Sequence, residues 1–312
     1  MLDVRRLRLL RELAHRGTIA AVAEALAFTP SAVSQQLAVL EREAGVPLLE
    51  RTGRRVTLTP AGHQLVEHAE AVLERLERAA AELADARRGL AGPLRIGTFP
   101  SAGRVIIPAA LALLAREHPR LEPMVAEIDP AGVADALRAG ELDVALVHDY
   151  DFVPSASDAG LDTEPLLEEP MYLASPASPP DSWGGGKAGG AGGPDQDQGQ
   201  DQDPVGRWSE APWILAMPGT MCHAMATRAC QAAGFSPRVR HHIDDFSTVL
   251  ALVTIGQGVA LIPELGAGDP PPGVVLTRLA MRRRTRIAFR RGAGAHPAVA
   301  AFAGSLRAAT GG

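Results

Sequence analysis

Apolar residues in the first part of the chain recur at helical spacing in three separate runs. The first run predicts a helix over residues 3–15. The second predicts a short helix capped by Thr18, whose hydroxyl can accept from a free backbone amide, and the third a helix capped by Ser31 that ends at Gly45. Two short helices joined by a tight turn form a helix-turn-helix, whose second member can lie in the major groove of DNA.

The following segment predicts a wing and then a long helix. Residues 46–59 suit two short strands around Thr52–Gly53, and Pro60 suits the first turn of a helix. An apolar stripe then repeats every ~3.5 residues, which is the pattern of a two-helix coiled seam. The stripe consists of Leu65, Ala69, Val72, Leu76, Ala79, Leu83 and Ala86. We expect residues 61–88 to pair two copies of the chain; a helix packed on its own domain is the alternative.

The rest of the chain alternates between strand and helix patterns, which predicts parallel βαβ layers. The first set is strand 94–98, helix 104–118, strand 124–128, helix 131–139 and strand 144–148. The second is extended segment 166–175, strand 213–216, helix 221–233, strand 239–242, helix 247–255 and strand 259–262. Strand 285–291 and helix 297–308 can return to the first set.

The predicted fold class is therefore α/β, with an N-terminal winged helix-turn-helix, a long linker helix and a two-lobed body. The expected boundaries are 1–60 for the head, 61–90 for the linker, 91–163 with 273–312 for lobe I, and 164–272 for lobe II. Residues 177–206 are rich in glycine, aspartate and glutamine and cannot bury enough apolar surface to order themselves. We expect them to be a disordered surface insertion without chemistry.

Composition and charge narrow the function. The 312 residues are 46% hydrophobic and carry a formal charge of −5, yet residues 1–62 hold nine arginines against six acidic residues. A basic head on an acidic body is typical of a nucleic-acid-binding module. The longest weakly polar run, 249–263, is shorter than the ~20 apolar residues of a membrane span, and arginines interrupt the start of the chain where a secretory signal would be apolar. We expect a cytoplasmic protein with no membrane partner.

Motifs for enzyme chemistry are missing from the sequence. The two cysteines, Cys222 and Cys230, cannot make a disulfide framework or a four-thiolate zinc site. There is no P-loop, no G-x-S-x-G and no H-E-x-x-H, and the pair Gly256 and Gly258 precedes a strand instead of following one. We therefore expect no catalytic residue, no cofactor and no metal.

The stretch IAAVAEALAFTPSAVSQQLAVLEREAGVPLLERTGRRVTLTPAG, residues 19–62, resembles the DNA-binding head of the LysR-type transcriptional regulators. The motifs LRIG, GELDVAL and GQGVALIP extend the resemblance through the body, except for the insertion. The resemblance implies a cytoplasmic dimer or dimer of dimers that binds palindromic promoter DNA. It also implies a body similar to type 2 periplasmic binding proteins, with a small effector between its lobes.

The expected DNA contacts lie on the second helix of the motif and on the wing. Gln35 can pair with adenine, and short hydroxyls can bond phosphates or base edges. The full set is Thr29, Ser31, Ser34, Gln35, Arg51, Arg54 and Arg55. Because the family most often has Gln, Pro and Arg where this chain has Pro30, Ser31 and Gln35, its base preference cannot be transferred.

Most of the expected effector contacts lie where loops enter helices in both lobes, and the resemblance to the family implies Pro130 and His148 in addition. Ser101 begins a helix, where free amides favour an anion or carboxylate. The full set is Ser101, Pro130, His148, Met221, Cys222, His223 and Ser247. At Pro130 and His148 some family members have a hydroxyl and an arginine, a departure that argues against an aromatic acid as effector.

Two further readings stay open. Cys222 and Cys230 lie near the redox pair of the family's peroxide sensors, with one residue fewer between them, so a thiol-based sensor is one alternative. The other is a two-lobed cytosolic small-molecule-binding protein whose basic head serves only dimerisation. The main expectation is an effector-responsive DNA-binding transcriptional regulator.

Overall fold

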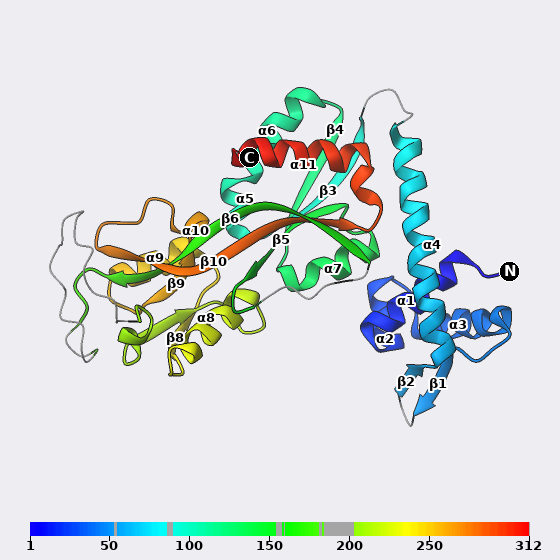
Figure 1. Ribbon diagram of the computed structural model, residues 1–312, viewed down its shortest axis with the longest axis horizontal. Helices are drawn as coiled ribbons and strands as arrows, with labels where there is room; N and C mark the ends of the chain where they lie inside the picture. Colours follow the sequence, from blue (N-terminus) through cyan, green and yellow to red (C-terminus); the bar gives the residue numbers. More distant parts are fainter. Residues whose placement is uncertain are drawn as a thin grey trace.

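The computed structural model describes residues 1–52, 55–85, 90–153, 158, 160–180, 183 and 203–311. Figure 1 shows a small helical head, a long helix that rises from it, and a body of two lobes joined by long strands. Among the described residues, no helix is both long and apolar enough to cross a membrane.

The head contains three helices and a two-stranded hairpin. These are α1 (Val4–Arg16), α2 (Ile19–Ala25), α3 (Pro30–Ala44), β1 (Leu49–Thr52) and β2 (Arg55–Leu58). All three helices contribute to its core, where Leu10, Val22, Leu37 and Leu40 are buried. The predicted helix-turn-helix and hairpin are confirmed.

The start of α3 differs from the prediction in one detail. Ser31 is not the cap; the Oγ1 of Thr29 accepts from the backbone amide of Ala32 at 3.2 Å. Pro30 is the first helical residue, because its fixed φ suits this position and its missing amide would have had no partner there. At α2, Thr18 caps the helix as predicted, accepting from the amide of Ala21.

The long helix α4 (Pro60–Asp85) begins in close contact with the head. A Cβ atom at Gly62 would lie 2.2 Å from the carbonyl oxygen of Leu48, so glycine allows the helix to start there. Ala69, two turns later, is fully buried in the head core.

This packing corrects part of the predicted coiled seam. Leu65 and Ala69 pack in the chain's own head instead of facing a second copy. Further along, the stripe is open: Val72, Leu76 and Leu83 are 40, 49 and 71% exposed. Ala86 lies outside the described residues. Only the upper half of the stripe is therefore available to another chain.

The body divides its elements between two lobes. Lobe I contains β3 (Gly92–Thr98), α5 (Pro100–Val105), α6 (Ile107–Glu117), β4 (Leu121–Glu127), α7 (Pro130–Ala139), β5 (Val144–Tyr150) and α11 (Pro297–Thr310). Lobe II contains β7 (Pro212–Leu215), α8 (Met221–Ala232), β8 (Arg238–His242), α9 (Phe246–Thr254), β9 (Ala260–Pro263) and α10 (Glu264–Ala267). Two long antiparallel strands, β6 (Leu161–Pro176) and β10 (Val274–Arg290), run through both lobes.

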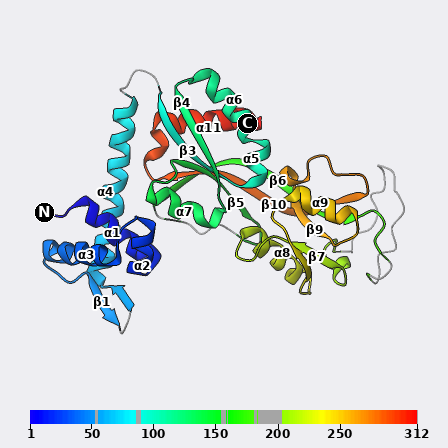
Figure 2. The same ribbon diagram turned by 180° about the vertical axis from the view of Figure 1, so that it is seen from behind.

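One sheet connects the lobes, with strand order β4-β3-β5-β10-β6-β9. Strands β3, β4 and β5 are parallel, and β10 is antiparallel to β5 and β6. In lobe I, α6 and α11 cover one face of this sheet and α7 covers the other (Figures 1 and 2). In lobe II, β7 pairs with β8 and meets β9 through a bridge from Trp213 to Val259.

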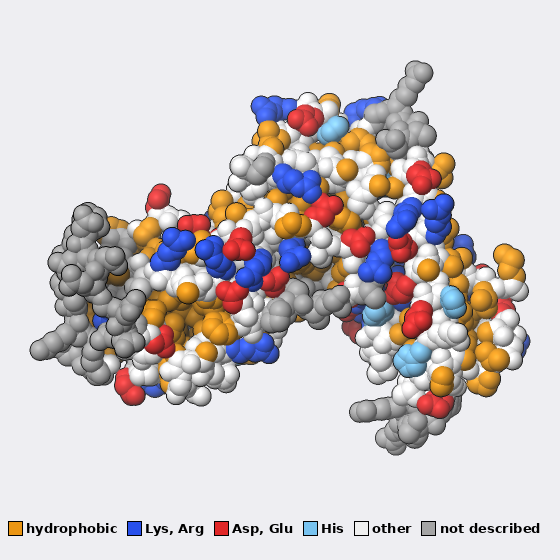
Figure 3. Space-filling view, viewed as in Figure 1, with side chains coloured by type: hydrophobic (Ala, Val, Ile, Leu, Met, Phe, Trp, Pro, Cys, Tyr) orange, Lys and Arg blue, Asp and Glu red, His pale blue; other side chains and the backbone are white. Residues whose placement is uncertain are grey.

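Strand β10 is much longer than the predicted segment 285–291. Its buried side chains alternate along the strand: Leu279, Met281, Arg283, Thr285, Ile287 and Phe289. Its outward arginines form ion pairs with acidic residues of β5 and β6, and Figure 3 shows this mixed row of charges. The pattern was missed because an arginine occupies one of the inward positions.

The prediction that all of 177–206 is a disordered insertion is wrong at its ends. Trp183 and Val205 are each 7% exposed and pack in the lobe II core with Trp208 and Trp213. Apolar residues at both ends therefore belong to the fold. Residues 184–202 lie outside the described residues.

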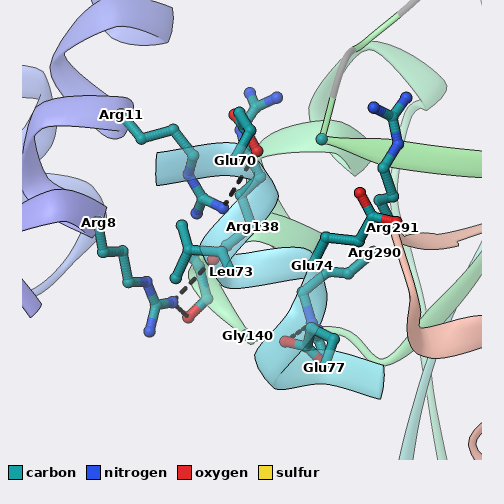
Figure 4. A pocket seen from close by; sticks show the side chains of 12 residues that line it. Arg8, Arg11, Glu70, Leu73, Glu74, Glu77, Arg138, Gly140, Arg290 and Arg291 are labelled. Carbon is teal, nitrogen blue, oxygen red and sulfur yellow. Dashed lines mark hydrogen bonds and ion pairs between the residues drawn. The ribbon is translucent and has the colours of Figure 1, made fainter. Parts of the chain in front are cut away.

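The head rests on lobe I through arginines. An Nη atom of Arg8 donates to the backbone carbonyls of Arg138 and Ala139, at the C-terminal end of α7, with distances of 2.7 and 2.8 Å. Arg16 pairs with Asp135 on the same helix at 3.0 Å. A cavity of about 380 Å³ remains at this junction (Figure 4). Cationic side chains at a helix C-terminus are favourable, so α7 holds the head in place.

Candidate DNA-binding surface and interlobe cavity

The outer face of α3 is polar and points away from the body. Ser31 and Gln35 are exposed and Ser34 is half-buried, whereas Val33 and Leu37 face the head core. Figures 1 and 2 both show α3 on the side of the head opposite the lobes. This face is therefore free to approach another molecule.

The wing stands beside α3, with Leu49 opposite Leu58 and Thr52 opposite Arg55. Arg54 lies outside the described residues, and so do the side chains of Arg51 and Arg55. Thr29 uses its hydroxyl oxygen as the α3 cap, and its hydroxyl group also lies 3.2 Å from that of Ser31. The predicted contacts on the helix thus lie together at one end of α3.

A cavity of about 230 Å³ lies between the two lobes. Four predicted effector contacts line it: Ser101, Pro130, His148 and Cys222. Phe99, Glu127, Asp129, Thr220, Asp244, Phe246 and Arg283 also line it. Lobe I, lobe II and β10 all contribute to this wall, so a ligand here would contact both lobes.

The other three predicted contacts lie elsewhere. Met221 lines a separate cavity of about 740 Å³. The ring of His223 stacks on that of His242, with centroids 5.9 Å apart. The hydroxyl of Ser247 accepts from a guanidinium nitrogen of Arg104 at 2.5 Å. The structure does not bring these side chains to the 230 Å³ cavity.

Arg283 forms the floor of the cavity and makes an ion pair with Glu169, which is also fully buried. Arg283 and Glu169 are 0 and 1% exposed, and Arg283 Nε donates to Glu169 Oε1 at 2.8 Å. An Nη atom of Arg283 also donates to the hydroxyl of Ser101 at 3.0 Å. The second oxygen of Glu169 accepts from the backbone amide of Leu265 at 2.6 Å. The pair therefore connects lobe I, the two crossing strands and lobe II.

The same pair holds the hydroxyl of Ser101 in place. Ser101 is only 4% exposed, and its hydroxyl accepts from Arg283. Helix α5 has only six residues, and Phe99 caps it without a side-chain hydrogen bond. The guanidinium of Arg283 also lies 4.9 Å from the centre of the Phe99 ring.

A thiol, a phenol and an imidazole meet beside this floor. The Cys222 Sγ lies 3.1 Å from the Tyr150 hydroxyl and 4.0 Å from His148 Nε2. Burial raises the pKa of the Cys222 thiol, and burial together with Arg283 lowers the pKa of His148 well below its usual value. At neutral pH the thiol is protonated and the imidazole is neutral. His148 Nδ1 is buried without a hydrogen-bond partner among the described residues.

Two family models match this chain and cover both parts. Residues 4–63 match the model described as bacterial regulatory helix-turn-helix protein, lysR family, and residues 87–311 match the LysR substrate binding domain. The chain belongs to the LysR family. It is a DNA-binding transcriptional regulator with an effector-binding domain.

Relatives and solved structures agree with this assignment. A probable hydrogen peroxide-inducible genes activator of Mycobacterium avium is 30% identical to this LysR regulator over 259 residues, covering 83% of this chain and 76% of that protein. The uncharacterized HTH-type transcriptional regulator YcgK of Bacillus subtilis is 28% identical over 280 residues, covering 88% and 84%. A cysteine mutant of OxyR from Corynebacterium glutamicum superposes with a TM-score of 0.56 at 25% identity, covering 100% of this chain and 92% of that one.

A fourth comparison concerns the fold alone. Full-length CbnR in complex with its target DNA superposes with a TM-score of 0.52 at 22% identity, covering 99% of this chain and 100% of that one. The LysR regulator described here therefore has the same arrangement of head, long helix and two lobes.

Sequence reasoning missed the buried residues of the LysR regulator's cavity, above all Arg283, Glu169 and Tyr150. Arg283 lies in a run of three arginines that reads as a solvated surface. The signal that could have found it is the period-two alternation of buried positions along β10, which places an arginine in line with apolar neighbours.

Proposed function

We propose that this LysR regulator binds promoter DNA by placing α3 in the major groove. The observation that carries the proposal is the polar start of α3, where Ser31 and Gln35 are exposed and Ser34 is half-buried, on a helix that lies on the side of the head away from the lobes. The arginines of the wing, Arg51, Arg54 and Arg55, then reach the sugar-phosphate backbone or the groove beside it.

Two heads act together in this proposal. The open half of the α4 stripe, from Val72 to Leu83, gives a second copy an apolar surface to cover. A two-fold dimer then presents two α3 helices to a palindromic site, and paired dimers would cover a longer one. Because promoter DNA lies in the cytoplasm of a bacterium, we place the regulator there, and we assign it no catalytic activity.

The small-molecule effector belongs, in this proposal, to the interlobe cavity. Ser101, Pro130, His148 and Cys222 line it from both lobes, and the buried pair of Arg283 and Glu169 connects the lobes beneath it. A ligand that favours one spacing of the lobes shifts the body between conformations, and it can do so only by its difference in affinity for them. Arg8 and Arg16 of α1 rest on α7 of lobe I, so movement of that lobe reaches the head.

Fluorescence anisotropy with the regulator's own promoter DNA tests the assignment. Gln35→Ala is expected to weaken specific binding by about tenfold or more, since a good base contact contributes about 1–3 kcal/mol of discrimination. Gln231→Ala removes an exposed glutamine of α8 in lobe II and is the matched control. Equal affinity of both variants for promoter and unrelated DNA would refute the proposal and favour a head that serves only dimerisation.

The structure gives no support to a thiol-based sensor. Burial raises the pKa of Cys222 and raises that of Cys230 to about 12, so neither side chain is a thiolate at neutral pH. Both lie on the single helix α8, eight positions apart, which corresponds to ~12 Å along the axis. Several relatives are named for hydrogen peroxide induction, but the thiols here do not favour that chemistry.

A further inference from the structure

Three carboxylates from opposite lobes line the interlobe cavity. Glu127 ends β4 and Asp129 caps α7 in lobe I, while Asp244 lies between β8 and α9 in lobe II. Backbone amides fix two of them: Asp129 accepts from Ala131 at 2.9 Å and Asp244 accepts from Met217 at 2.9 Å. All three residues are exposed, so they form a negative rim around the cavity.

Among the described residues that line the cavity, the single arginine does not balance this rim, because its charge is already paired with Glu169. Arg283 is the one arginine in that lining, and it is fully buried and paired with Glu169 beneath the floor. His148 is neutral, because burial and Arg283 lower its pKa. The exposed Arg104 lies nearby but outside the lining, with its guanidinium on Ser247 and on the carbonyl of Leu265.

Asp129 and Asp244 act on the same point in the cavity. Burial raises the pKa of the Cys222 thiol, Tyr150 and Arg283 lower it, and both carboxylates raise it, so the fields of Asp129 and Asp244 meet at this thiol. The remaining wall is apolar and aromatic, with the rings of Phe99 and Phe246. His148 is only 2% exposed. Its ring nitrogen Nδ1 has no hydrogen-bond partner within the described structure.

These features fit one kind of ligand. A carboxylate or phosphate here would lose its hydration beside three like charges and gain no free cationic partner, which is unfavourable. An ammonium or guanidinium group would instead meet carboxylates of both lobes. The aromatic rings of the wall would attract the cation as well and would cover the apolar chain of the ligand.

We propose that the effector of this regulator is a small organic cation, an amine or guanidine with an apolar chain, held between the carboxylates of the two lobes. This inference rests on the proposed function, because it assigns the effector to the interlobe cavity. A cation that pairs with both Asp129 and Asp244 also draws the two lobes together. Binding of the ligand can therefore change the conformation of the body.

Isothermal titration calorimetry with the full-length protein tests the charge preference. The probes are butane-1,4-diamine and butanedioate, which have the same carbon chain and opposite charges. The diamine is expected to bind at least about tenfold more tightly, since each partly exposed ion pair contributes up to about 1 kcal/mol. Tighter or equal binding of butanedioate, or no heat from the diamine, overturns the proposal.

Variants locate the effect. Asp129→Asn combined with Asp244→Asn keeps both side-chain oxygens that accept from backbone amides and removes both charges. This double variant is expected to weaken binding of the diamine by about tenfold. The difference in affinity between the diamine and butanedioate should become smaller. Glu117→Gln combined with Glu210→Gln removes one exposed carboxylate from each lobe outside the cavity lining, and it should leave both affinities unchanged. A diamine affinity that survives in the aspartate variant contradicts the proposed site.

Promoter binding by the same preparations separates this inference from the function on which it rests. Specific DNA binding with no diamine binding overturns the cationic effector and leaves the regulator intact. Diamine binding that requires Asp129 and Asp244, without sequence-specific DNA binding, supports the charge preference of the cavity and contradicts its role as an effector site of a DNA-binding protein.

Discussion

Removal of the Arg283 side chain is expected to destabilise the body strongly. Arg283 and Glu169 are 0 and 1% exposed, and the pair is joined by contacts of 2.8 Å at Nε and 2.7 Å at Nη2. Arg283→Met leaves the Glu169 carboxylate buried with only the Leu265 amide, and breaking such a pair costs about 3–5 kcal/mol. The double variant Arg283→Met with Glu169→Leu removes both charges and should recover most of this loss.

Urea unfolding followed by tryptophan fluorescence measures the effect. All three tryptophans of the chain lie in the lobe II core. Their fluorescence therefore follows the unfolding of lobe II, to which the ion pair is connected. With a slope of about 3 kcal/mol per molar urea, the single variant should shift the midpoint down by about 1 M or more. The control Arg282→Met breaks an exposed pair at 3.3 Å and should change stability by less than about 1 kcal/mol.

Two results would refute this reasoning. A shift for Arg283→Met no larger than that for Arg282→Met would show that the buried pair is not what holds the lobes. A double variant less stable than the single one would show that Glu169 does not depend on Arg283.

Three further predictions follow from the same structure. Leu76→Glu with Leu83→Glu, at the open half of the α4 stripe, should convert the dimer to a monomer in analytical ultracentrifugation, and an unchanged mass would contradict the assigned seam. His148 has a folded-state pKa well below its unfolded value, because burial and Arg283 disfavour its charged form; the unfolded state therefore binds more protons, and stability should fall as the pH drops below ~6.5. His148→Gln should lack this part of the pH dependence of urea unfolding; an identical profile would contradict the buried neutral imidazole. Gly62→Ala should lower the melting temperature of the head through overpacking of about 1–3 kcal/mol, because its Cβ would lie 2.2 Å from the Leu48 carbonyl oxygen, and an unchanged melting temperature would contradict this close approach.

The head could be predicted from sequence because its signals are local. Thr18 caps α2 and the left-handed Gly17 and Gly45 end α1 and α3, each within a few residues of the helix that it bounds. The error at Ser31 was also local: Pro30 takes the first helical position, so the cap is Thr29 and not Ser31.

The body was predicted as alternating elements but not as a connected sheet. Strands β6 and β10 each pass from one lobe into the other, near the register shift between Arg278 and Arg282. No turn residue in the sequence marks that point. The cavity floor needed knowledge of the fold, since Arg283 and Glu169 are 114 residues apart and both are charged. Composition alone would have placed them on the surface.

Ser101 and Cys222, which line the cavity, were predicted because each lies where a loop enters a helix, whereas Pro130 and His148 came from the resemblance to the family. Ser247, at a similar position, instead binds Arg104, which no spacing in the sequence indicates. The charge of the rim depends on three carboxylates that are separate in sequence and converge only in the folded protein.

The measurement that tests the central claim most directly is a hydroxyl-radical footprint of the full-length protein on its own promoter DNA. If α3 of each head enters a major groove, two half-sites on one face of the duplex are protected, about one helical turn or a multiple of it apart, and Gln35→Ala weakens both. Absence of discrete protection at concentrations that saturate the DNA, or protection that is indifferent to Gln35, would contradict the account.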